Sequence, residues 1–297
     1  MKSGKYIDLQ IHSDYSDGLL SPKNIVEKAK KANLAVIALT DHDVIDGVSE
    51  AVAHGKKTGV KVIAGVELYA SFQKKDLHIL GYGIDLNNKI LNNALRKIQG
   101  KHLQKVAESI EKLKKSGFII DFNGVRKTKS KYIGISHIVS HLWKNKGNRL
   151  IIKRQIKSHY ITLPLIAAQY FIPHKSAYLP QESIPASDAI KLIKGAGGLP
   201  VLAHPGQQLT WKDDYIIKDL KEIGIKGMEV LSPYHNWHQT EHYQKIASLL
   251  NLVPTGGSDF HGDLPLEKHM VVRNQWDYFK VPYQIYLNLR KYLKYGK

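Results

Sequence analysis

Short apolar runs with the length of β-strands alternate along this chain with helical patterns, and potential metal ligands follow several of these runs. The run at residues 6–12 ends on His12, and the run at residues 34–39 leads into Asp41 and His42. Because α/β barrels collect the residues that follow their strands at one end of the barrel, these side chains are expected to meet. Imidazole and carboxylate groups gathered in this way are typical of a multi-metal hydrolytic site.

Seven such runs predict seven strands, at residues 6–12, 34–39, 61–68, 77–83, 199–203, 227–231 and 252–255. Helices are expected between them, at residues 21–32, 46–58, 187–195, 212–223 and 237–250, with Ser21 and Ser187 as N-caps. The residues between the third and fourth strands are too few for a parallel crossover, which leaves a hairpin or a distorted barrel at that point. The pattern predicts an α/β fold with a closed or nearly closed barrel. The tail is expected to add a strand at residues 270–272 and a basic helix from about Pro282.

Residues 85–184 interrupt this alternation and predict a mostly helical, basic insertion. Residues 87–117 carry a long amphipathic pattern, which fits a helix pair or one long helix, and residues 118–184 resemble short helices and loops. We therefore expect residues 1–84 to form the first part of the barrel, and residues 185–297 its second part with a C-terminal helix. The insertion would act as a lid or substrate-binding element.

The charge is concentrated in the same insertion. It contains 19 Lys and Arg against 5 Asp and Glu, which gives +14 of the formal net charge of +18. A basic block beside an acid-rich site predicts a polyanionic substrate, such as a phosphate ester or a nucleic acid. The alternative is a general bias toward lysine, with the lysines on solvated helix faces. Such a bias alone, however, would also make the rest of the chain strongly basic.

Composition excludes several other classes of protein. The 297 residues contain no cysteine, so disulfides and thiolate ligands are excluded and any metal must be held by nitrogen and oxygen. No window has the roughly 18 apolar residues of a membrane span, and no apolar targeting segment precedes the first strand. We expect a soluble, cytoplasmic protein, and nothing in the sequence indicates an obligate protein partner.

Six segments together resemble the PHP (polymerase and histidinol phosphatase) family. They are Asp8-Leu9-Gln10-Ile11-His12-Ser13, Asp17-Gly18, Thr40-Asp41-His42-Asp43, Gly65-Val66-Glu67, Ala203-His204-Pro205-Gly206 and Gly257-Ser258-Asp259-Phe260-His261-Gly262. The resemblance runs over nearly the whole chain and is vaguest in the insertion. It is greatest to the stand-alone PHP phosphoesterases, which include nucleotide phosphatases and enzymes that trim RNA from its 5′ end. It implies a distorted seven-stranded barrel, in agreement with the strand count.

The resemblance also implies a site for up to three divalent metal ions, with manganese favoured over iron or zinc. The first ion would take Gln10, His12, Glu67 and Asp259, the second Glu67, His78 and His204, and the third Asp17, His42 and His261. Glu67 would bridge the first two ions. The two-residue spacing of Gln10 and His12 places both on one face of a strand.

Gln10 departs from the family pattern, which has histidine at this position. An amide oxygen can bind a hard cation but is a poorer ligand than imidazole for zinc or iron. The change therefore predicts an altered metal preference or a weaker first site, with His12, Glu67 and Asp259 left to hold the ion.

The implied reaction is hydrolysis of a phosphate ester by a metal-activated hydroxide. Glu67 and Asp259 would act with the metals, and His137 matches a family histidine that binds phosphate or protonates the leaving oxygen. Ile135 stands where the family often has arginine. Phosphate contacts are therefore expected from other residues of the insertion, with the candidates Lys131, Lys175 and Tyr178.

Three functions stay open at this point. The first is a phosphoesterase that acts on nucleotides or on 5′-phosphorylated short RNA, and the second is a small-molecule phosphatase of the histidinol phosphatase type. The third is a catalytically weak nucleic-acid-binding protein, which the Gln10 change allows. His238 and His242 have the spacing of a zinc-protease helix, but Gln239 follows His238 where that motif requires glutamate, so we expect a surface helix face. Asp41 and Asp43 either orient His42 or cap a loop.

Overall fold

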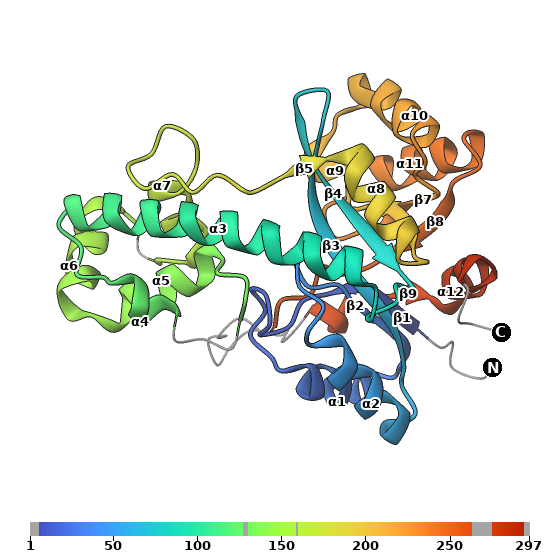
Figure 1. The fold of residues 1–297 in the computed structure, drawn as a ribbon, viewed down its shortest axis with the longest axis horizontal. Coiled ribbons are helices and arrows are strands. Elements are labelled where there is room, and N and C mark those ends of the chain that lie inside the picture. Colours follow the sequence, from blue (N-terminus) through green and yellow to red (C-terminus); the bar gives the residue numbers. More distant parts are fainter. Residues whose placement is uncertain (1–5, 127–129, 159, 263–274, 294–297) are drawn as a thin grey trace. The chain divides into compact units, whose positions relative to one another are not determined.

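The computed structural model describes residues 6–126, 130–158, 160–262 and 275–293, and the chain divides into two compact units (Figure 1). The barrel unit comprises Met1–Leu95 and Ser183–Lys297, and the helical unit comprises Arg96–Glu182. We propose that the helical unit is the predicted insertion, although it begins at Arg96 instead of residue 85 and ends at Glu182 instead of residue 184.

One mixed sheet forms the barrel unit. Its strands are β1 (Tyr6–Ile11), β2 (Leu34–Leu39), β3 (Lys61–Phe72), β4 (Lys75–Tyr82), β5 (Ile184–Pro185), β6 (Leu199–Leu202), β7 (Gly227–Leu231), β8 (Val253–Gly256) and β9 (Val281–Pro282). The order is β8-β7-β6-β4-β3-β2-β1-β9, with β5 beside β3. The two-residue strands β5 and β9 are additions to the seven longer strands, which correspond to the seven predicted ones.

The sheet curves into a nearly closed barrel. Beyond β8 the chain reaches β1, where Phe260 bridges to Ile11 and the His12 N–H donates to the Phe260 carbonyl at 2.8 Å. Most neighbouring strands are parallel, but β4 runs antiparallel to both β3 and β6. The expectation of a nearly closed α/β barrel is therefore confirmed, and of the two alternatives left open between the third and fourth strands the structure has the hairpin.

Amphipathic helices cover the strands of the barrel unit. They are α1 (Pro22–Lys31), α2 (Val48–Thr58), α8 (Ala186–Gly195), α9 (Pro205–Gln208), α10 (Asp214–Glu222), α11 (Trp237–Leu249) and α12 (Tyr283–Leu289), with 3₁₀ turns η1 (Trp211–Asp213), η2 (Gln275–Asp277) and η3 (Arg290–Tyr292). Figure 1 shows α1 beside α2, and both pack on the first strands. Ser21 caps α1 as predicted, since its hydroxyl accepts from the Asn24 N–H, and Pro22 occupies the first turn.

Two local predictions were wrong. Ser187 was expected to cap α8, but the helix begins one residue earlier and Pro185 occupies the N-cap, because proline's fixed φ suits the entry to a helix. Glu67 was expected at the end of a strand, but β3 continues to Phe72 because the antiparallel neighbour β4 pairs with it residue by residue as far as Lys75. The strand predicted at residues 270–272 lies outside the described residues.

The helical unit has its own core. It contains most of α3 (Lys89–Lys115), together with α4 (Phe122–Arg126), α5 (Ile135–Lys144), α6 (Lys146–Gln155) and α7 (Leu163–Tyr170). The long pattern at residues 87–117 is thus a single helix. A cluster that includes Val106, Ile110, Ile138 and Leu142 is buried inside this unit. Within the described part of the chain, no helix combines the length and apolar character needed to cross a membrane.

Candidate metal centre

β1 and the loop after it deliver the first predicted ligands. Gln10 and His12 alternate with Leu9 and Ile11 and so project from the opposite face of the strand. The following loop carries Asp17. Asp41 holds this loop, because its carboxylate accepts from the Ser13 N–H at 2.6 Å, the Ser13 hydroxyl at 2.7 Å and the Ser16 hydroxyl at 2.5 Å. Of the two roles open for Asp41, these contacts support loop capping.

Glu67 lies at the centre of the predicted ligands and is fully buried. Its two carboxylate oxygens face five side chains from separate segments of the barrel unit. The contacts of Oε1 are Gln10 Nε2 at 2.9 Å, His78 Nδ1 at 3.0 Å and His204 Nε2 at 3.2 Å, and those of Oε2 are His12 Nε2 at 3.1 Å and His42 Nδ1 at 3.5 Å. A carboxylate that faces imidazoles with both oxygens is suited to bridge two cations.

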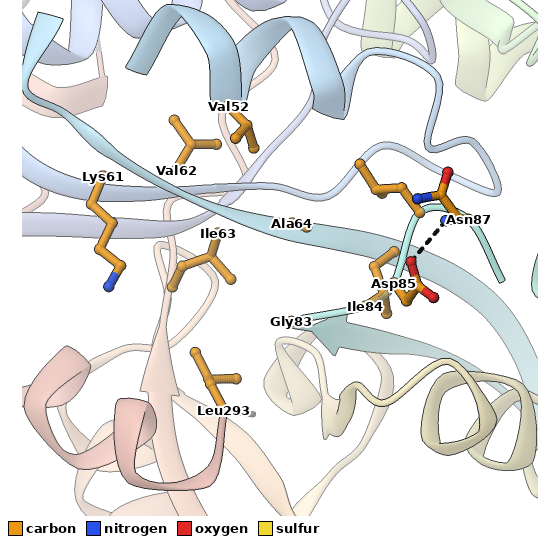
Figure 2. A pocket seen from close by; sticks show the side chains of 11 residues that line it. Val52, Lys61, Val62, Ile63, Ala64, Gly83, Ile84, Asp85, Asn87 and Leu293 are labelled. Atoms are coloured by element: carbon orange, nitrogen blue, oxygen red, sulfur yellow. Dashed lines mark hydrogen bonds between the residues drawn. The ribbon is translucent and has the colours of Figure 1, made fainter. Parts of the chain in front are cut away.

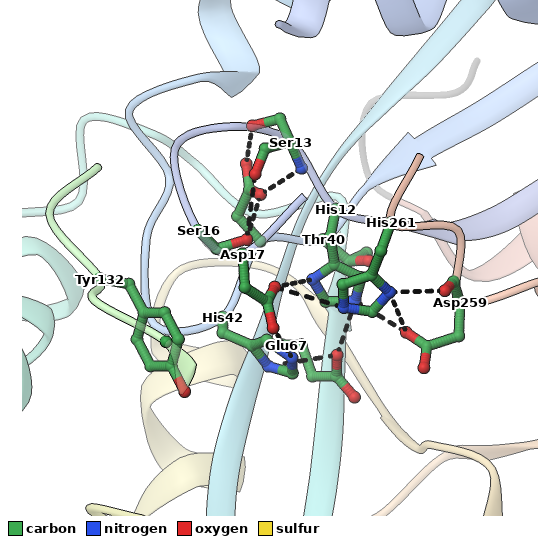
Figure 3. A network of polar contacts seen from close by, with 12 residues as sticks. His12, Ser13, Ser16, Asp17, Thr40, His42, Glu67, Tyr132, Asp259 and His261 are labelled. Atoms are coloured by element: carbon green, nitrogen blue, oxygen red, sulfur yellow. Dashed lines mark hydrogen bonds and ion pairs between the residues drawn. The ribbon is translucent and has the colours of Figure 1, made fainter. Parts of the chain in front are cut away.

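A second group of ligands surrounds Asp17 (Figure 3). Its Oδ1 lies 3.3 Å from His261 Nε2 and 3.8 Å from His12 Nδ1, and its Oδ2 lies 3.9 Å from His42 Nε2. Asp259 joins this group to the first, because its Oδ1 lies 2.9 Å from His12 Nε2. All nine predicted ligands therefore belong to one connected network, which lies entirely in the barrel unit.

The donor atoms of this network fit divalent cations. Three overlapping groups have ligating atoms within 4.8 Å of one another, and they are His12–Asp17–His42–His261, His42–Glu67–His78 and His12–Glu67–Asp259. Among the described residues, no Lys or Arg side chain forms an ion pair with the three acids Asp17, Glu67 and Asp259. Buried carboxylates without a cationic side chain need another source of positive charge. The oxygen and nitrogen donors suit several first-row metals.

Burial and neighbouring charges tune the protonation of these groups. Burial alone would raise the pKa of Glu67, but His42 and His78 outweigh it and hold the pKa well below the usual value. Burial lowers the pKa of His42 to about 3, so its ring is neutral at physiological pH. An ionised carboxylate and a neutral imidazole are the forms that bind metals.

Two residues at this site were missed in the sequence. Glu229 is buried in β7, where its Oε2 accepts from the His204 N–H at 2.8 Å and burial raises its pKa to about 8. The Tyr234 hydroxyl donates to Asp259 Oδ2 at 2.8 Å, and its ring stands edge-on to His204. A carboxylate inside an otherwise apolar strand was a readable signal for Glu229, whereas nothing in the sequence distinguished Tyr234.

His235 and His242 of the barrel unit have structural contacts. His235 uses both ring nitrogens, because Nδ1 donates to the Val230 carbonyl at 2.9 Å and Nε2 accepts from the Gly206 N–H at 3.0 Å. His242 Nε2 pairs with Asp214 at 2.9 Å on α11. His238 is exposed on the same helix, and neither it nor His242 belongs to a candidate metal group within the described residues.

The predicted substrate-binding residues all lie in the helical unit. His137 sits in the first turn of α5, where its Nδ1 accepts from the Gly134 N–H at 3.1 Å. The Tyr178 N–H donates to the Lys175 carbonyl at 3.2 Å and closes a turn. Lys131 lines a cavity within this unit. The roles of these four residues stay predictions.

A separate cavity of about 380 Å³ lies at the amino end of β3 (Figure 2). Its walls are mainly aliphatic, with Val62, Ile63 and Ile84 among them. The Asp85 carboxylate accepts a hydrogen bond from the Asn87 N–H at 2.9 Å. The groups that line it include no histidine and no cluster of acids. This cavity therefore lacks the chemistry found around Glu67.

Comparisons with known proteins show what this chain is similar to. The model of the PHP domain family matches residues 8–160. A 3′,5′-nucleoside bisphosphate phosphatase of Chromobacterium violaceum is 30% identical over 262 residues, which cover 86% of this chain and 87% of that protein. A 5′-3′ exoribonuclease of Haemophilus influenzae is 28% identical over 263 residues, with 86% and 90% coverage.

Solved structures show the same fold. An amidohydrolase from Chromobacterium violaceum, solved with bound sulfate and no metal, superposes with a TM-score of 0.76 at 28% identity and covers 95% of this chain and 96% of its own. A protein from Bifidobacterium adolescentis reaches a TM-score of 0.81 at 24% identity, with 98% and 97% coverage. The nearly closed barrel, the network around Glu67 and the match over more than half of the sequence lead to one conclusion: this chain belongs to the PHP domain family.

Proposed function

We propose that this PHP-domain protein is a metal-dependent phosphoesterase that hydrolyses phosphate esters of nucleotides or of 5′-phosphorylated short RNA. The observation that carries the proposal is the buried network around Glu67, in which acids and imidazoles converge and no Lys or Arg of the described residues forms an ion pair with the acids. The names of the relatives support the substrate class, since one is a nucleoside bisphosphate phosphatase and another an exoribonuclease.

The proposed ligand sets follow the three contact groups. Gln10, His12, Glu67 and Asp259 would hold the first cation, Glu67, His78 and His204 the second, and Asp17, His42 and His261 the third. When bound, divalent cations supply Lewis acidity, which makes hydroxide available near neutral pH and neutralises the phosphoryl oxygens. Glu67 remains ionised because the imidazoles around it hold its pKa low.

Residues around the ligands keep them in place. The Tyr234 hydroxyl fixes the outer oxygen of Asp259, and the Glu229 carboxylate fixes the backbone that carries His204. Asp41 holds the loop that carries Asp17. Such outer contacts orient ligands and raise the affinity for metal.

Manganese is the proposed metal. Gln10 Oε1 is buried and accepts no hydrogen bond within the described residues, so an acceptor is available to a hard cation. Amide and carboxylate oxygens suit manganese and magnesium better than zinc. His137 is the proposed donor to the leaving group or the phosphate, with Lys131, Lys175 and Tyr178 as further substrate contacts.

The experiment is a substrate panel on protein of known metal content. Turnover of a 3′,5′-bisphosphonucleotide or a 5′-phosphorylated oligoribonucleotide with added Mn²⁺ would support the proposal. Preferred turnover of histidinol phosphate would instead indicate a small-molecule phosphatase. Absence of any turnover with metal bound would refute the proposal and leave a nucleic-acid-binding protein with weak catalysis.

A further inference from the structure

Tyr69 lies among the proposed metal ligands without being one of them. It follows Glu67 by two residues on β3, so the two side chains project from the same face of the strand. Its cross-strand neighbour on the antiparallel strand β4 is His78. The Tyr69 side chain is buried. The hairpin that carries β3 past Glu67 therefore places an aromatic ring inside the network of ligands.

The Tyr69 ring contacts two imidazoles in different geometries. It stacks on His42, with ring centroids 4.6 Å apart and an angle of 19° between the planes. It meets His78 edge to face, with centroids 4.6 Å apart and an angle of 85°. Tyr69 thus constrains the planes of two imidazoles that belong to different proposed metal sites.

The contact with His42 ends a series of four neighbouring rings. His12 and His261 are stacked with centroids 4.3 Å apart, and His12 and His42 have the same centroid distance with their planes tilted by 32°. Figure 3 shows these three imidazoles, and Tyr69 is the fourth ring. The backbone of His42 is anchored separately, because it forms a parallel β-bridge with Glu67. The orientation of the His42 ring is then constrained by its contacts with the rings of His12 and Tyr69.

These ring contacts involve only side chains of the chain itself, so they form before any metal binds. An imidazole that can rotate freely loses rotamer entropy when it coordinates a cation, which lowers the affinity. Imidazoles already held by packing have lost this freedom on folding. A residue that orients two ligands should therefore affect the binding of more than one ion.

We infer that Tyr69 is a positioning residue that preorganises His42 and His78 and so couples the affinities of the second and third proposed metal sites. The inference rests on the proposed function, because it takes the network around Glu67 to be a metal centre. It goes further by assigning the arrangement of ligands for two ions to one uncharged ring. The role is assigned to the ring, so phenylalanine should be able to replace tyrosine.

The test is a calorimetric titration of the metal-free full-length protein with Mn²⁺ and, separately, with Zn²⁺, which gives the number of sites and the affinity of each. Tyr69→Leu removes the ring and keeps an apolar side chain. It is expected to lower the affinity of two sites about tenfold, which is the lower end of the range for residues that orient ligands. Tyr69→Phe keeps the ring contacts and should remain within about threefold of the wild type.

Tyr243→Leu is the matched control in the barrel unit. Tyr243 on α11 is buried and also contacts two imidazoles, those of His235 and His242, at centroid distances of 4.8 Å and 5.3 Å. Within the described part of the chain, neither histidine belongs to a candidate metal group. Tyr243→Leu should lower thermal stability, as loss of a buried ring does. It should change the metal affinities about twofold or less, because substitutions at separate sites act independently.

Each outcome decides the inference. Unchanged affinities in Tyr69→Leu, or equal losses in Tyr69→Leu and Tyr243→Leu, would overturn it. A loss confined to one site would overturn the coupling, and a loss in Tyr69→Phe as large as in Tyr69→Leu would overturn the assignment to the ring. If Tyr69→Leu does not fold by circular dichroism, Tyr69→Met replaces it, because methionine adapts to irregular space in a core.

Hydrolysis of the substrate panel is measured separately from metal binding. If the wild type binds metal but hydrolyses no phosphate ester, the proposed function is refuted and the role of Tyr69 stands on the affinities. If the wild type hydrolyses the substrates and Tyr69→Leu binds metal as tightly as the wild type, the role of Tyr69 alone is refuted. Absence of binding of either ion by the wild type would overturn both.

Discussion

The two units hold their charged groups in opposite ways. In the barrel unit, Glu67 is fully buried and both of its oxygens face histidines. In the helical unit, Glu182 contacts Lys101 and Lys105 near the surface, and residues 96–182 contain 18 Lys and Arg against 4 Asp and Glu. The effect of a buried charge depends on its position relative to specific neighbours, whereas the effect of exposed charges depends mainly on the net charge of the surface. Single substitutions of charged residues should therefore have large effects on activity, metal content or stability in the barrel unit and small effects in the helical unit.

The largest expected effect comes from Glu67→Gln in the barrel unit. Loss of residues that merely orient metal ligands costs about 10–100-fold in activity or affinity. Loss of a bridging ligand should cost more, at least about a hundredfold in kcat/KM together with most of the bound metal. Metal analysis and hydrolysis of a bisphosphonucleotide provide the two measurements.

Glu182→Gln is the matched substitution in the helical unit. It removes two ion pairs of a partly exposed carboxylate and should leave metal content unchanged. A loss of metal in Glu182→Gln as large as in Glu67→Gln would break the contrast between the two units.

The pH dependence of stability sharpens the same contrast. Burial raises the pKa of Asp8 from 3.8 to about 6, so the folded state holds this proton more tightly than the unfolded state. The resulting stabilisation is present below pH 4 and is lost as the pH rises through about 6. The free energy of unfolding of the wild type relative to Asp8→Asn should therefore fall by about 2–3 kcal/mol across this window, measured by urea unfolding in EDTA.

Glu182 should show the opposite sign. Burial tends to raise the pKa of Glu182, but the hydrogen bond from Lys105 outweighs it and lowers the pKa below 4.5. Its stabilisation is present above pH 4.5 and is lost as the pH falls further.

If wild type and Asp8→Asn change in parallel with pH, the raised pKa of Asp8 is wrong.

Gln10→His should strengthen the first metal site. Imidazole is a better ligand than an amide for zinc and other late metals. We expect about a tenfold gain in zinc affinity, measured by calorimetry, which corresponds to about 1.4 kcal/mol. The control is Gln104→His, which adds an exposed histidine to α3 in the helical unit. An equal gain in both variants would show that the new histidine binds zinc independently of the site.

The smallest expected effect is that of Tyr234→Phe, which removes the hydrogen bond to Asp259 and keeps the ring. Manganese affinity should fall about fivefold, less than the about 10–100-fold typical of residues that orient a ligand, because a single hydrogen bond of about 1 kcal/mol is lost and Asp259 keeps its contact with His12. Tyr170→Phe removes a comparable hydroxyl in the helical unit, where the partner is Gln155 at 2.7 Å. It should lower thermal stability slightly without changing metal affinity, and a shift in metal affinity there would contradict the comparison.

The alternation of apolar runs was enough to predict the fold. The seven strands follow from local periodicity, whereas the structure decided between the alternatives left open, with a hairpin after the third strand and a single helix within residues 87–117. Predictions failed where a neighbour decides the outcome. β3 was expected to end at Glu67 but continues beyond it, because β4 pairs with it there. That pairing depends on contacts between strands.

The candidate site divides in the same way. The sequence alone determined which residue types could bind metal, because histidines, acids and glycine-rich turns recur in motifs that can be read locally. Tertiary structure alone decided that Glu67 faces five partners, that Tyr234 reaches Asp259 and that Tyr69 stacks on His42. The reason is that the sequence gives the chemical type of each side chain directly. The distance between two side chains depends instead on how segments far apart in the chain pack together.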